Sequence, residues 1–268
     1  GVGVCVPGPV DVREGCVPHH TPGMPGWQGM SLSARLGTAF GVPCVVDNDA
    51  NAMAFGEYMT LGTTAAERSL SSPLLFVKTS TGIGAGMVVD GAVLRGAEAG
   101  EGDLGHVRIT SAEDGPSCVC GRRGCLAASA SGRALARALQ EQGIDAPDSR
   151  SVVELALAGR EEATRLVRES GLMVGDVLAT AVSLLNPAVL VLGGDLGLVH
   201  DHFVGALRER LYQRIQPQAA RALRVVPSTL GDRAGIVGAA LGILELVLSP
   251  ASVDRALEER QLPAPAVP

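Results

Sequence analysis

Short apolar runs bounded by glycine, proline and polar residues recur along the chain and predict β-strands. They lie at residues 1–6, 44–46, 74–78, 87–89, 188–192 and 223–226. The run 188–192 is apolar throughout, which is typical of a strand in a parallel sheet that is covered on both faces. We therefore expect a sheet whose central strands are buried.

Between these runs, apolar residues at helical spacing predict helices. The expected helices cover residues 32–40, 50–57, 132–142, 161–185, 200–215 and 233–248. Ser131 is a candidate N-cap, and Gly143 and Asn186 stand where helices should end. The Pro- and Gly-rich residues 19–29 predict a loop, and the tail 249–268 predicts one or two helical turns.

Three polar residues, Asp47, Asn48 and Asp49, follow the strand expected at 44–46 and lead into a helix. The carboxyl end of a strand is where α/β sheets place ligands. A carboxylate there can take a proton from a hydroxyl group, and a neighbouring amide can orient that hydroxyl. The alternative is that Asn48 or Asp49 only caps the helix, and one residue suffices for that role.

A second candidate site is the Gly-rich segment T-S-T-G-I-G-A-G at residues 79–86, between two apolar strands. We expect a hairpin whose backbone N–H groups face an anion such as a phosphate. Alone, this glycine pattern is a weak signal, because glycine serves tight turns of every kind.

A third candidate is a metal site between residues 103 and 125, where His106, Cys118, Cys120 and Cys125 fall close together. One imidazole nitrogen and three thiolates complete a tetrahedron around Zn²⁺, which leaves no position for water and indicates a structural ion. The second imidazole nitrogen stays free to contact a ligand. The alternatives are ordinary buried cysteines beside a core histidine, or a disulfide, which the reducing context argues against.

The composition narrows the function classes. The chain has 268 residues, 46% of them hydrophobic and only 3% aromatic, which is enough for a substantial core filled by Val, Leu and Ala. A net charge of −6 argues against nucleic-acid binding by this chain itself. No apolar run approaches the roughly 20 residues of a membrane helix, so we expect a cytoplasmic protein without membrane contact. Because the chain opens inside an apolar run, we also expect an N-terminal portion to be missing.

Taken together and in order, these motifs resemble the ROK family of sugar kinases and sugar-responsive repressors. The resemblance rests on P-G-P at residues 7–9, P-G-W at residues 25–27, D-N-D-A-N, S-T-G-I-G-A-G, G-D-L-G-H and C-V-C-G-R-R-G-C, and it runs from Gly1 to about Leu248. It implies an α/β fold of the actin-like ATPase (ribonuclease H-like) kind, with an incomplete N-terminal lobe. The implied divisions are 1–110 (N-terminal lobe and cleft), 111–130 (zinc loop), 131–248 (C-terminal lobe) and 249–268 (tail).

The resemblance also assigns roles to single residues. It implies that Asp49 is the general base of a kinase and that Asn48 holds the neighbouring sugar hydroxyl, with Asp103 and His106 also at the sugar. It implies that the zinc ligands are His106, Cys118, Cys120 and Cys125, that the second phosphate loop includes Thr81, Gly82 and Gly84, and that the turn near adenosine is Gly193 and Gly194.

Three departures from the kinase pattern weaken the expectation of catalysis. Asp103 stands where kinases have Glu, and Ala127 replaces a Glu that bonds the sugar. A buried hydroxyl without its acceptor would cost about 1–3 kcal/mol. The first phosphate motif of the family would lie upstream of Gly1, and phosphoryl transfer depends on such positioning, so we expect little or no transfer by this chain.

The wording of the motifs is closer to actinobacterial ROK regulators than to glucokinases. We therefore expect the effector-sensing part of a transcriptional regulator, in which a sugar or sugar phosphate closes the lobes. DNA would be contacted only through a segment absent from this chain, and the family implies a homodimer or homotetramer. The alternative is an ATP- and Mg²⁺-dependent hexose or N-acylhexosamine kinase that uses Asp49 as its base.

Overall fold

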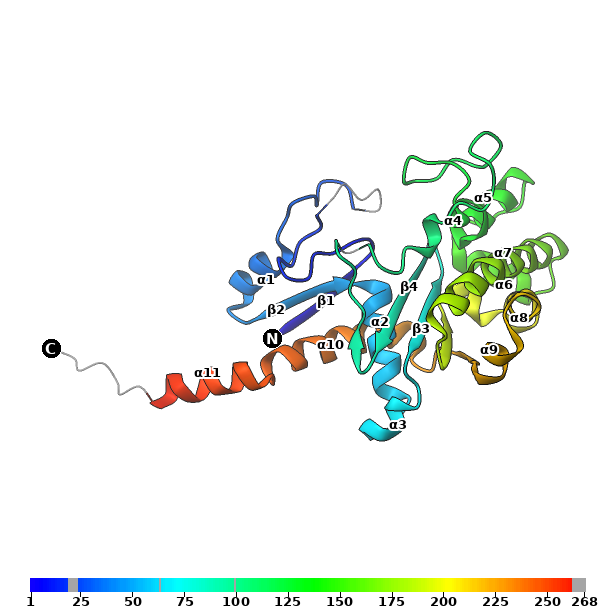
Figure 1. The fold of residues 1–268 in the computed structure, drawn as a ribbon. Helices are drawn as coiled ribbons and strands as arrows, with labels where there is room; N and C mark the ends of the chain where they lie inside the picture. The colour runs from blue at the N-terminus through cyan, green and yellow to red at the C-terminus, as the bar shows by residue number, and fades with distance from the viewer. Residues whose placement is uncertain (19–23, 63, 99, 262–268) are drawn as a thin grey trace.

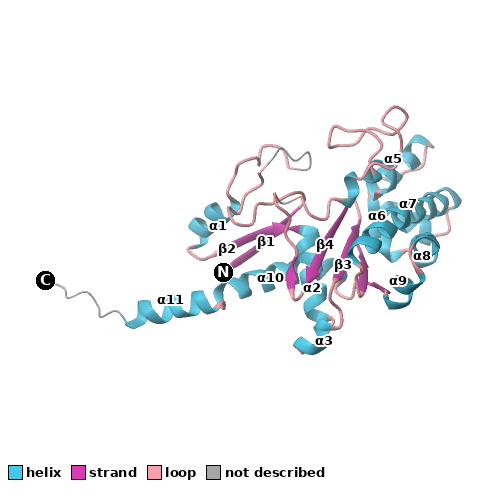
Figure 2. Ribbon diagram, viewed as in Figure 1, coloured by secondary structure: helices cyan, strands magenta, loops and turns pink. Residues whose placement is uncertain are grey.

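The computed structural model describes residues 1–18, 24–62, 64–98 and 100–261, so part of the loop expected at 19–29 lies outside the described residues. The described strands form two sheets (Figures 1 and 2). Their bounds are β1 Val2–Val6, β2 Cys44–Asn48, β3 Leu74–Thr79, β4 Ile83–Val89, β5 Ala92–Val93, β6 Val189–Gly193 and β7 Arg224–Pro227. Strands β1 and β2 pair in parallel, and the others form a five-stranded sheet of order β5-β4-β3-β6-β7.

The helices flank and extend these sheets (Figure 1). Their bounds are α1 Leu32–Phe40, α2 Asp49–Thr60, α3 Ala65–Ser69, α4 Leu126–Ala130, α5 Gly132–Glu141, α6 Ser149–Leu157, α7 Glu161–Leu185, α8 Gly205–Arg214, α9 Pro217–Ala222, α10 Ala234–Val247 and α11 Pro250–Gln261. Single 3₁₀ turns cover Leu104–His106, Asp195–Leu198 and Gly231–Arg233. The 25-residue helix α7 matches its expected bounds, 161–185.

The core lies on both faces of the five-stranded sheet. Alternate residues of β3 point to opposite faces, as the pleat of a strand requires. Leu75 and Val77 belong to the apolar cluster formed with α4 to α8, whereas Leu74 and Phe76 belong to the cluster that includes α2. Strand β6 pairs in parallel with β3 and β7 and is buried throughout, which confirms the strand expected at 188–192.

The Gly-rich segment 79–86 forms the expected hairpin but turns over fewer residues. Strand β4 already begins at Ile83 and pairs antiparallel with β3. Gly86 lies inside β4, and a Cβ atom there would lie 2.3 Å from the carbonyl oxygen of Ala50 in α2. Close packing against α2 therefore requires this glycine, and the interpretation of the whole segment as a turn is wrong for 83–86.

Two other helices differ from their expected lengths. The expected helix 200–215 opens with a π-helical turn at His200–Val204 before α8 begins. The tail holds α11, which has 12 residues, or about three turns, instead of one or two. Its Ala, Leu, Glu and Arg residues favour a helix, and Figure 1 shows α11 extending away from the sheets beyond α10.

Helix α10 crosses α2 with the two backbones in contact. A Cβ atom on Gly238 of α10 would lie 1.7 Å from the carbonyl oxygen of Ala52 in α2. A Cβ atom on Gly56 would lie 2.7 Å from the carbonyl oxygen of Ala234 in the same way. Helix α10 also packs on β1, where Gly3 meets the Ala239 carbonyl. Glycine alone fits these positions.

Within the described residues, no single helix has the length and apolar character to cross a membrane. The pair Gly231–Val247 and Pro250–Glu258, bent by 49°, meets those two criteria when taken together, by length and composition only.

Candidate functional site

A cavity of about 760 Å³ brings together several of the residues singled out in the sequence. Its walls come from the segment after β1, the end of β2, the β3–β4 hairpin, residues 98–106 and the cysteine loop. The expected site residues that line it are Asn48, Asp49, Gly82, Gly84, Asp103, His106 and Cys120. Thr81, Gly193 and Gly194 are not among the lining residues; Gly193, the last residue of β6, pairs with Lys78, which lines the cavity.

Asp49, the first residue of α2, forms an ion pair inside the cavity. Its Oδ2 accepts a hydrogen bond from Nζ of Lys78 on β3, at 2.5 Å. Both side chains are about four-fifths buried, with exposed fractions of 20% and 22%. The Oδ2 atom of Asp49 is thus already bonded to a cation.

Asn48 has the role of helix cap that the sequence left open. Its Oδ1 accepts from the backbone N–H groups of Ala50 and Asn51, at 2.9 and 3.2 Å. Its Nδ2 donates to the carbonyl oxygen of Gly8, at 2.8 Å. These bonds fix the side chain between α2 and the P-G-P turn, which leaves one N–H of the amide to meet a ligand in the cavity.

Residues that the sequence did not single out hold the cavity wall in place. Arg95 donates to both carboxylate oxygens of Asp47, at 2.7 and 2.5 Å, a planar two-point contact that fixes both side chains. Glu101 accepts from the buried Asn51 of α2, at 2.8 Å. Arg95 and Glu101 are thereby fastened to β2 and α2.

Lys78 carried a signal in the sequence that could have identified it. It is the only lysine among the 22 basic residues of the chain, and it stands in an otherwise apolar run. A charged residue in a buried strand needs a partner or a function. The structure supplies Asp49 as that partner.

The donor atoms of the cysteine loop lie at the separations that a tetrahedral ion requires. One donor atom each from His106, Cys118, Cys120 and Cys125 lies within 4.8 Å of all the others. Cys120 Sγ and Cys125 Sγ are 3.7 Å apart, and Cys118 Sγ lies 3.4 Å from His106 Nδ1. Two sulfurs bound to one tetrahedral zinc at about 2.3 Å would lie about 3.8 Å apart. The residues present therefore fit a Cys₃His zinc site.

The pKa values of the three thiols in this cluster shift in different directions. Burial raises the pKa of the Cys125 thiol to about 12, and hydrogen bonds with Cys120 and Cys118 add to the rise. Burial also raises the pKa of Cys118. The pKa of Cys120 is lowered instead, because its burial is outweighed by hydrogen bonds with the Arg122 backbone, Cys118 and Cys125. A metal ion bound among the three sulfurs would remove the remaining thiol protons, because a coordinating thiol is deprotonated by the ion's charge.

His106 connects this cluster to the cavity. Its Nδ1 faces Cys118, whereas its Nε2 lies 3.9 Å from Oδ1 of Asp103. Desolvation raises the pKa of Asp103, and the opposite effects of His106 and Arg122 are smaller. Cys120 and Gly121 also line the cavity, so the cysteine loop forms one wall of it. Fixing the loop fixes His106.

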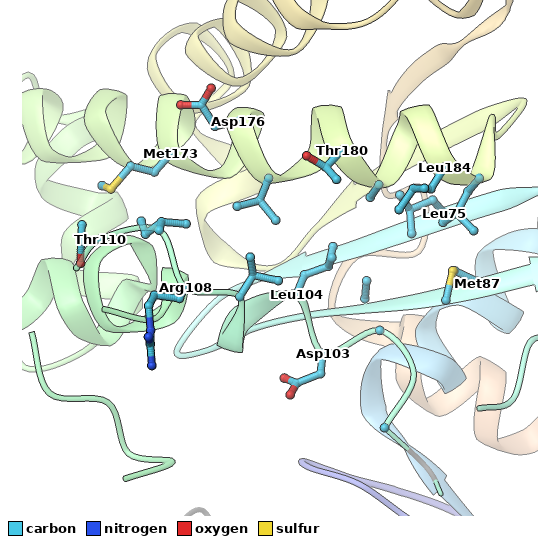
Figure 3. A pocket seen from close by; sticks show the side chains of 18 residues that line it. Leu75, Met87, Asp103, Leu104, Arg108, Thr110, Met173, Asp176, Thr180 and Leu184 are labelled. Carbon is cyan, nitrogen blue, oxygen red and sulfur yellow. The ribbon is translucent and has the colours of Figure 1, made fainter. Parts of the chain in front are cut away.

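A second hollow, of about 790 Å³, lies between α7 and residues 102–110 (Figure 3). Its lining is mainly apolar, with Leu75, Leu104, Met173 and Leu184 among the residues. Figure 3 shows the carboxylate of Asp103 pointing away from α7. The charged and amide side chains singled out in the sequence converge instead in the smaller cavity at Asp49, which is therefore the candidate site.

Comparisons with known proteins identify the family. The model of the ROK family matches residues 1–245. The xylose repressor of Bacillus spizizenii is 29% identical over 91% of this chain and 61% of its own length. The glucokinase of Thermotoga maritima is 33% identical over 92% of this chain and 80% of its own length. The chain thus spans about three fifths of that repressor.

A solved structure shows the same fold. The ROK family glucokinase of Streptomyces griseus, in complex with glucose and AMPPNP, superposes with a TM-score of 0.73. The two chains are 29% identical, and the match covers 89% of this chain and 79% of the glucokinase. Both repressors and sugar kinases are therefore among the relatives of this protein. The match over residues 1–245 settles the assignment: the chain belongs to the ROK family.

Proposed function

We propose that this chain is the sugar-binding, effector-sensing part of a ROK transcriptional regulator. The observation that carries the proposal is the ion pair in the cleft, where the carboxylate of Asp49 is bonded to Lys78. A general base must accept a proton from the attacking hydroxyl. An acid held by an ammonium group is suited to bind a hydroxyl as a fixed acceptor, which is what a sensor needs.

The cavity offers complementary groups for a polyhydroxylated ligand. Asp49 and Asp103 supply acceptors. The Asn48 amide and Lys78 supply donors from the carboxyl ends of β2 and β3. His106 presents Nε2 from the 3₁₀ turn Leu104–His106, beside the cysteine loop. A zinc ion bound by His106 and the three cysteines would hold that loop, and hence His106, in one position.

The wider assembly is part of the same proposal. Residues 1–110 would form the remaining N-terminal lobe and the cleft, 111–130 the zinc loop, 131–248 the C-terminal lobe and 249–268 the tail. Strand β3 pairs with β4 on one side and with β6 on the other, so ligand contacts on the hairpin would bear directly on the C-terminal lobe. The whole protein would act as a homodimer or homotetramer and contact DNA through a segment outside this chain.

The single lysine gives a direct test of sugar binding. Amine-reactive acetylation of the purified protein, followed by peptide mass spectrometry, reports the reactivity of Lys78 and of the terminal amine separately. A sugar that fills the cleft should slow Lys78 acetylation at least fivefold and raise the thermal midpoint, while the terminal amine stays unchanged. If no sugar in a panel of pentoses, hexoses and N-acetylhexosamines protects Lys78, the proposed function is wrong.

The second candidate function is an ATP-dependent sugar kinase. It is favoured by the place of Asp49, at the carboxyl end of β2 and inside the cavity, and by the relation to a glucokinase over 80% of that enzyme's length. In that case Asp49 would leave Lys78, take the proton of a sugar hydroxyl, and MgATP would supply the phosphoryl group. Sugar-dependent ADP release that disappears in Asp49→Asn would establish the kinase and overturn the sensor.

A further inference from the structure

The turn after β6 contains a carboxylate that already accepts two hydrogen bonds from the protein. Asp195 follows Gly193 and Gly194, and its Oδ2 accepts hydrogen bonds from the hydroxyl groups of Ser80 and Ser149. Nε of Arg150 lies 3.9 Å from its Oδ1. The exposed fraction of the Asp195 side chain is 16%.

The partners of Asp195 are the groups from which proteins build anion sites. Ser80 belongs to the turn of the β3–β4 hairpin, and Ser149 is the first residue of the nine-residue helix α6. Hydroxyl donors, an arginine and the amino end of a helix together favour a negative charge. Here that negative charge belongs to the protein itself.

The two glycines before Asp195 are closely packed. A Cβ atom on Gly193 would lie 2.4 Å from the ring of Phe76, and one on Gly194 would lie 2.6 Å from the carbonyl oxygen of Thr79. The lining of the sugar cavity includes Gly82 of the hairpin turn but not Asp195. The same hairpin turn thus contributes Gly82 to the cavity and Ser80 to the hydrogen bond with Asp195.

We propose that Asp195 is a specificity-determining residue that occupies, as an internal anion, the place where this turn would otherwise hold a phosphate group. The cleft then selects unphosphorylated sugars and binds neither a nucleoside triphosphate nor a sugar phosphate. The inference rests on the proposed sugar-binding function, and it narrows the ligand class that the cleft accepts.

Two features of the cleft point the same way. A phosphate brought to Ser80 would find its hydroxyl donor used and a fixed carboxylate beside it. On the sugar side, the lining residues include the acids Asp49, Glu98, Glu101 and Asp103, and the one lysine there is paired with Asp49. A dianionic ligand thus meets negative charge at both ends.

A bound cation is a poorer explanation of the cluster. Arg150 already faces Asp195 and lies 3.6 Å from Asp232 as well, so positive charge is present without an ion. Among the described His, Cys, Asp and Glu residues, the group with metal-ligand spacing is the one at His106, and it does not include Asp195.

The test compares ligands and variants in the full chain by isothermal titration calorimetry. The ligands are the sugar that protects Lys78, its phosphate ester, inorganic phosphate and MgAMPPNP. The variants are Asp195→Gly, which removes the internal anion, Asp195→Asn, which keeps its size, and Asp145→Asn, an exposed acid outside the cleft. Far-UV circular dichroism and thermal melts identify any variant that does not fold.

We expect the wild-type protein and Asp145→Asn to bind the sugar at least 30-fold more tightly than any of the phosphorylated ligands. Asp195→Gly should gain at least tenfold in affinity for inorganic phosphate or MgAMPPNP, and Asp195→Asn should gain less, while the affinity for the sugar stays within threefold. Wild-type binding of MgAMPPNP or the sugar phosphate as tight as that of the sugar overturns the inference but leaves sugar binding intact. If Asp195→Gly does not fold, the absence of any gain in a folded Asp195→Asn overturns it as well.

Discussion

Two aspartates in this protein occupy comparable positions in the chain and have different surroundings. Asp49 follows β2 and begins α2, and Asp195 follows β6 and begins a 3₁₀ turn. Asp49 lines an open cavity and is held by one ammonium group. Asp195 is held by two hydroxyl groups in a packed turn.

This difference shows that a strand-end carboxylate acquires its role from its neighbours. A ligand hydroxyl in the cavity can bond to Asp49 while Lys78 stays paired with it, because a carboxylate accepts about four hydrogen bonds. Asp195 shares its carboxylate between two hydroxyl groups and Arg150, and it is not among the residues that line the cavity. In the function proposed above, the first is a binding group and the second determines which ligands fit.

The largest effect should come from removing one of the four expected zinc ligands beside the cavity. We expect Cys125→Ser to lose zinc binding, to lose measurable sugar binding and to melt roughly 10 °C lower. The reason is that the cysteine loop would no longer be tied to His106. Metal content is measured by plasma mass spectrometry together with calorimetry. Cys44→Ser, a cysteine outside the cluster, should keep one zinc per chain. Full zinc content in Cys125→Ser would refute the ligand assignment.

A third carboxylate, Glu57 of α2, extends the comparison to a purely structural case. It is fully buried and accepts hydrogen bonds from the Ser228 and Thr229 hydroxyl groups and from the N–H groups of Thr229 and Leu230. Glu57→Gln places an N–H₂ group against these donors, and we expect a loss of about 2–4 kcal/mol in the free energy of unfolding.

Urea denaturation measures the effect of Glu57→Gln, and Glu258→Gln, an exposed site on α11, provides the matched control. The control should stay within about 0.5 kcal/mol of the wild-type protein. Equal stability of the two variants would show that the bonds of Glu57 contribute nothing net.

Asp49→Asn tests the proposed binding role of the aspartate that lines the cavity. We expect sugar affinity to fall at least tenfold, about 1.4 kcal/mol, because a charged acceptor is lost and Lys78 is left without its partner. Calorimetry against the protecting sugar measures this, with Asp90→Asn in the β4–β5 turn as the control. Unchanged affinity in Asp49→Asn would place the sugar elsewhere.

The smallest effect uses Cys5 of β1 to report the charge on Asp49. Burial raises the pKa of the Cys5 thiol, and Asp49 is the next largest cause. Replacing Asp49 by Asn should lower that pKa, so the thiolate fraction and the alkylation rate at a fixed pH between 8 and 9 should rise, by roughly two- to fivefold.

Cys16 is the matched control for this measurement. Burial and the acids Asp11 and Glu14 raise the pKa of its thiol, and Asp49 is not among the causes. Its alkylation rate, followed by peptide mass spectrometry, should be the same in both proteins. A parallel change at Cys16 would indicate a general loosening of the fold.

The sequence allowed the main elements to be predicted where local pattern decides the structure. The 25-residue helix α7 and the buried strand β6 follow from periodicity and apolar content, and the spacing of His106 with the three cysteines anticipates their convergence. Gly86 was assigned to a turn, but it lies in β4, where close contact with the distant helix α2 requires a glycine. Lys78 and Asp195 were missed because their partners lie 29 and 115 residues away.

The crossing of α2 and α10 has a consequence for the evolution of this protein. Because Gly56 and Gly238 bring carbonyl groups and backbone atoms into direct contact, any larger residue at either position separates two helices at once. Such a site has no chemistry of its own, yet it tolerates almost no substitution. We therefore expect random mutagenesis with selection for folded protein to return glycine almost exclusively at positions 56 and 238.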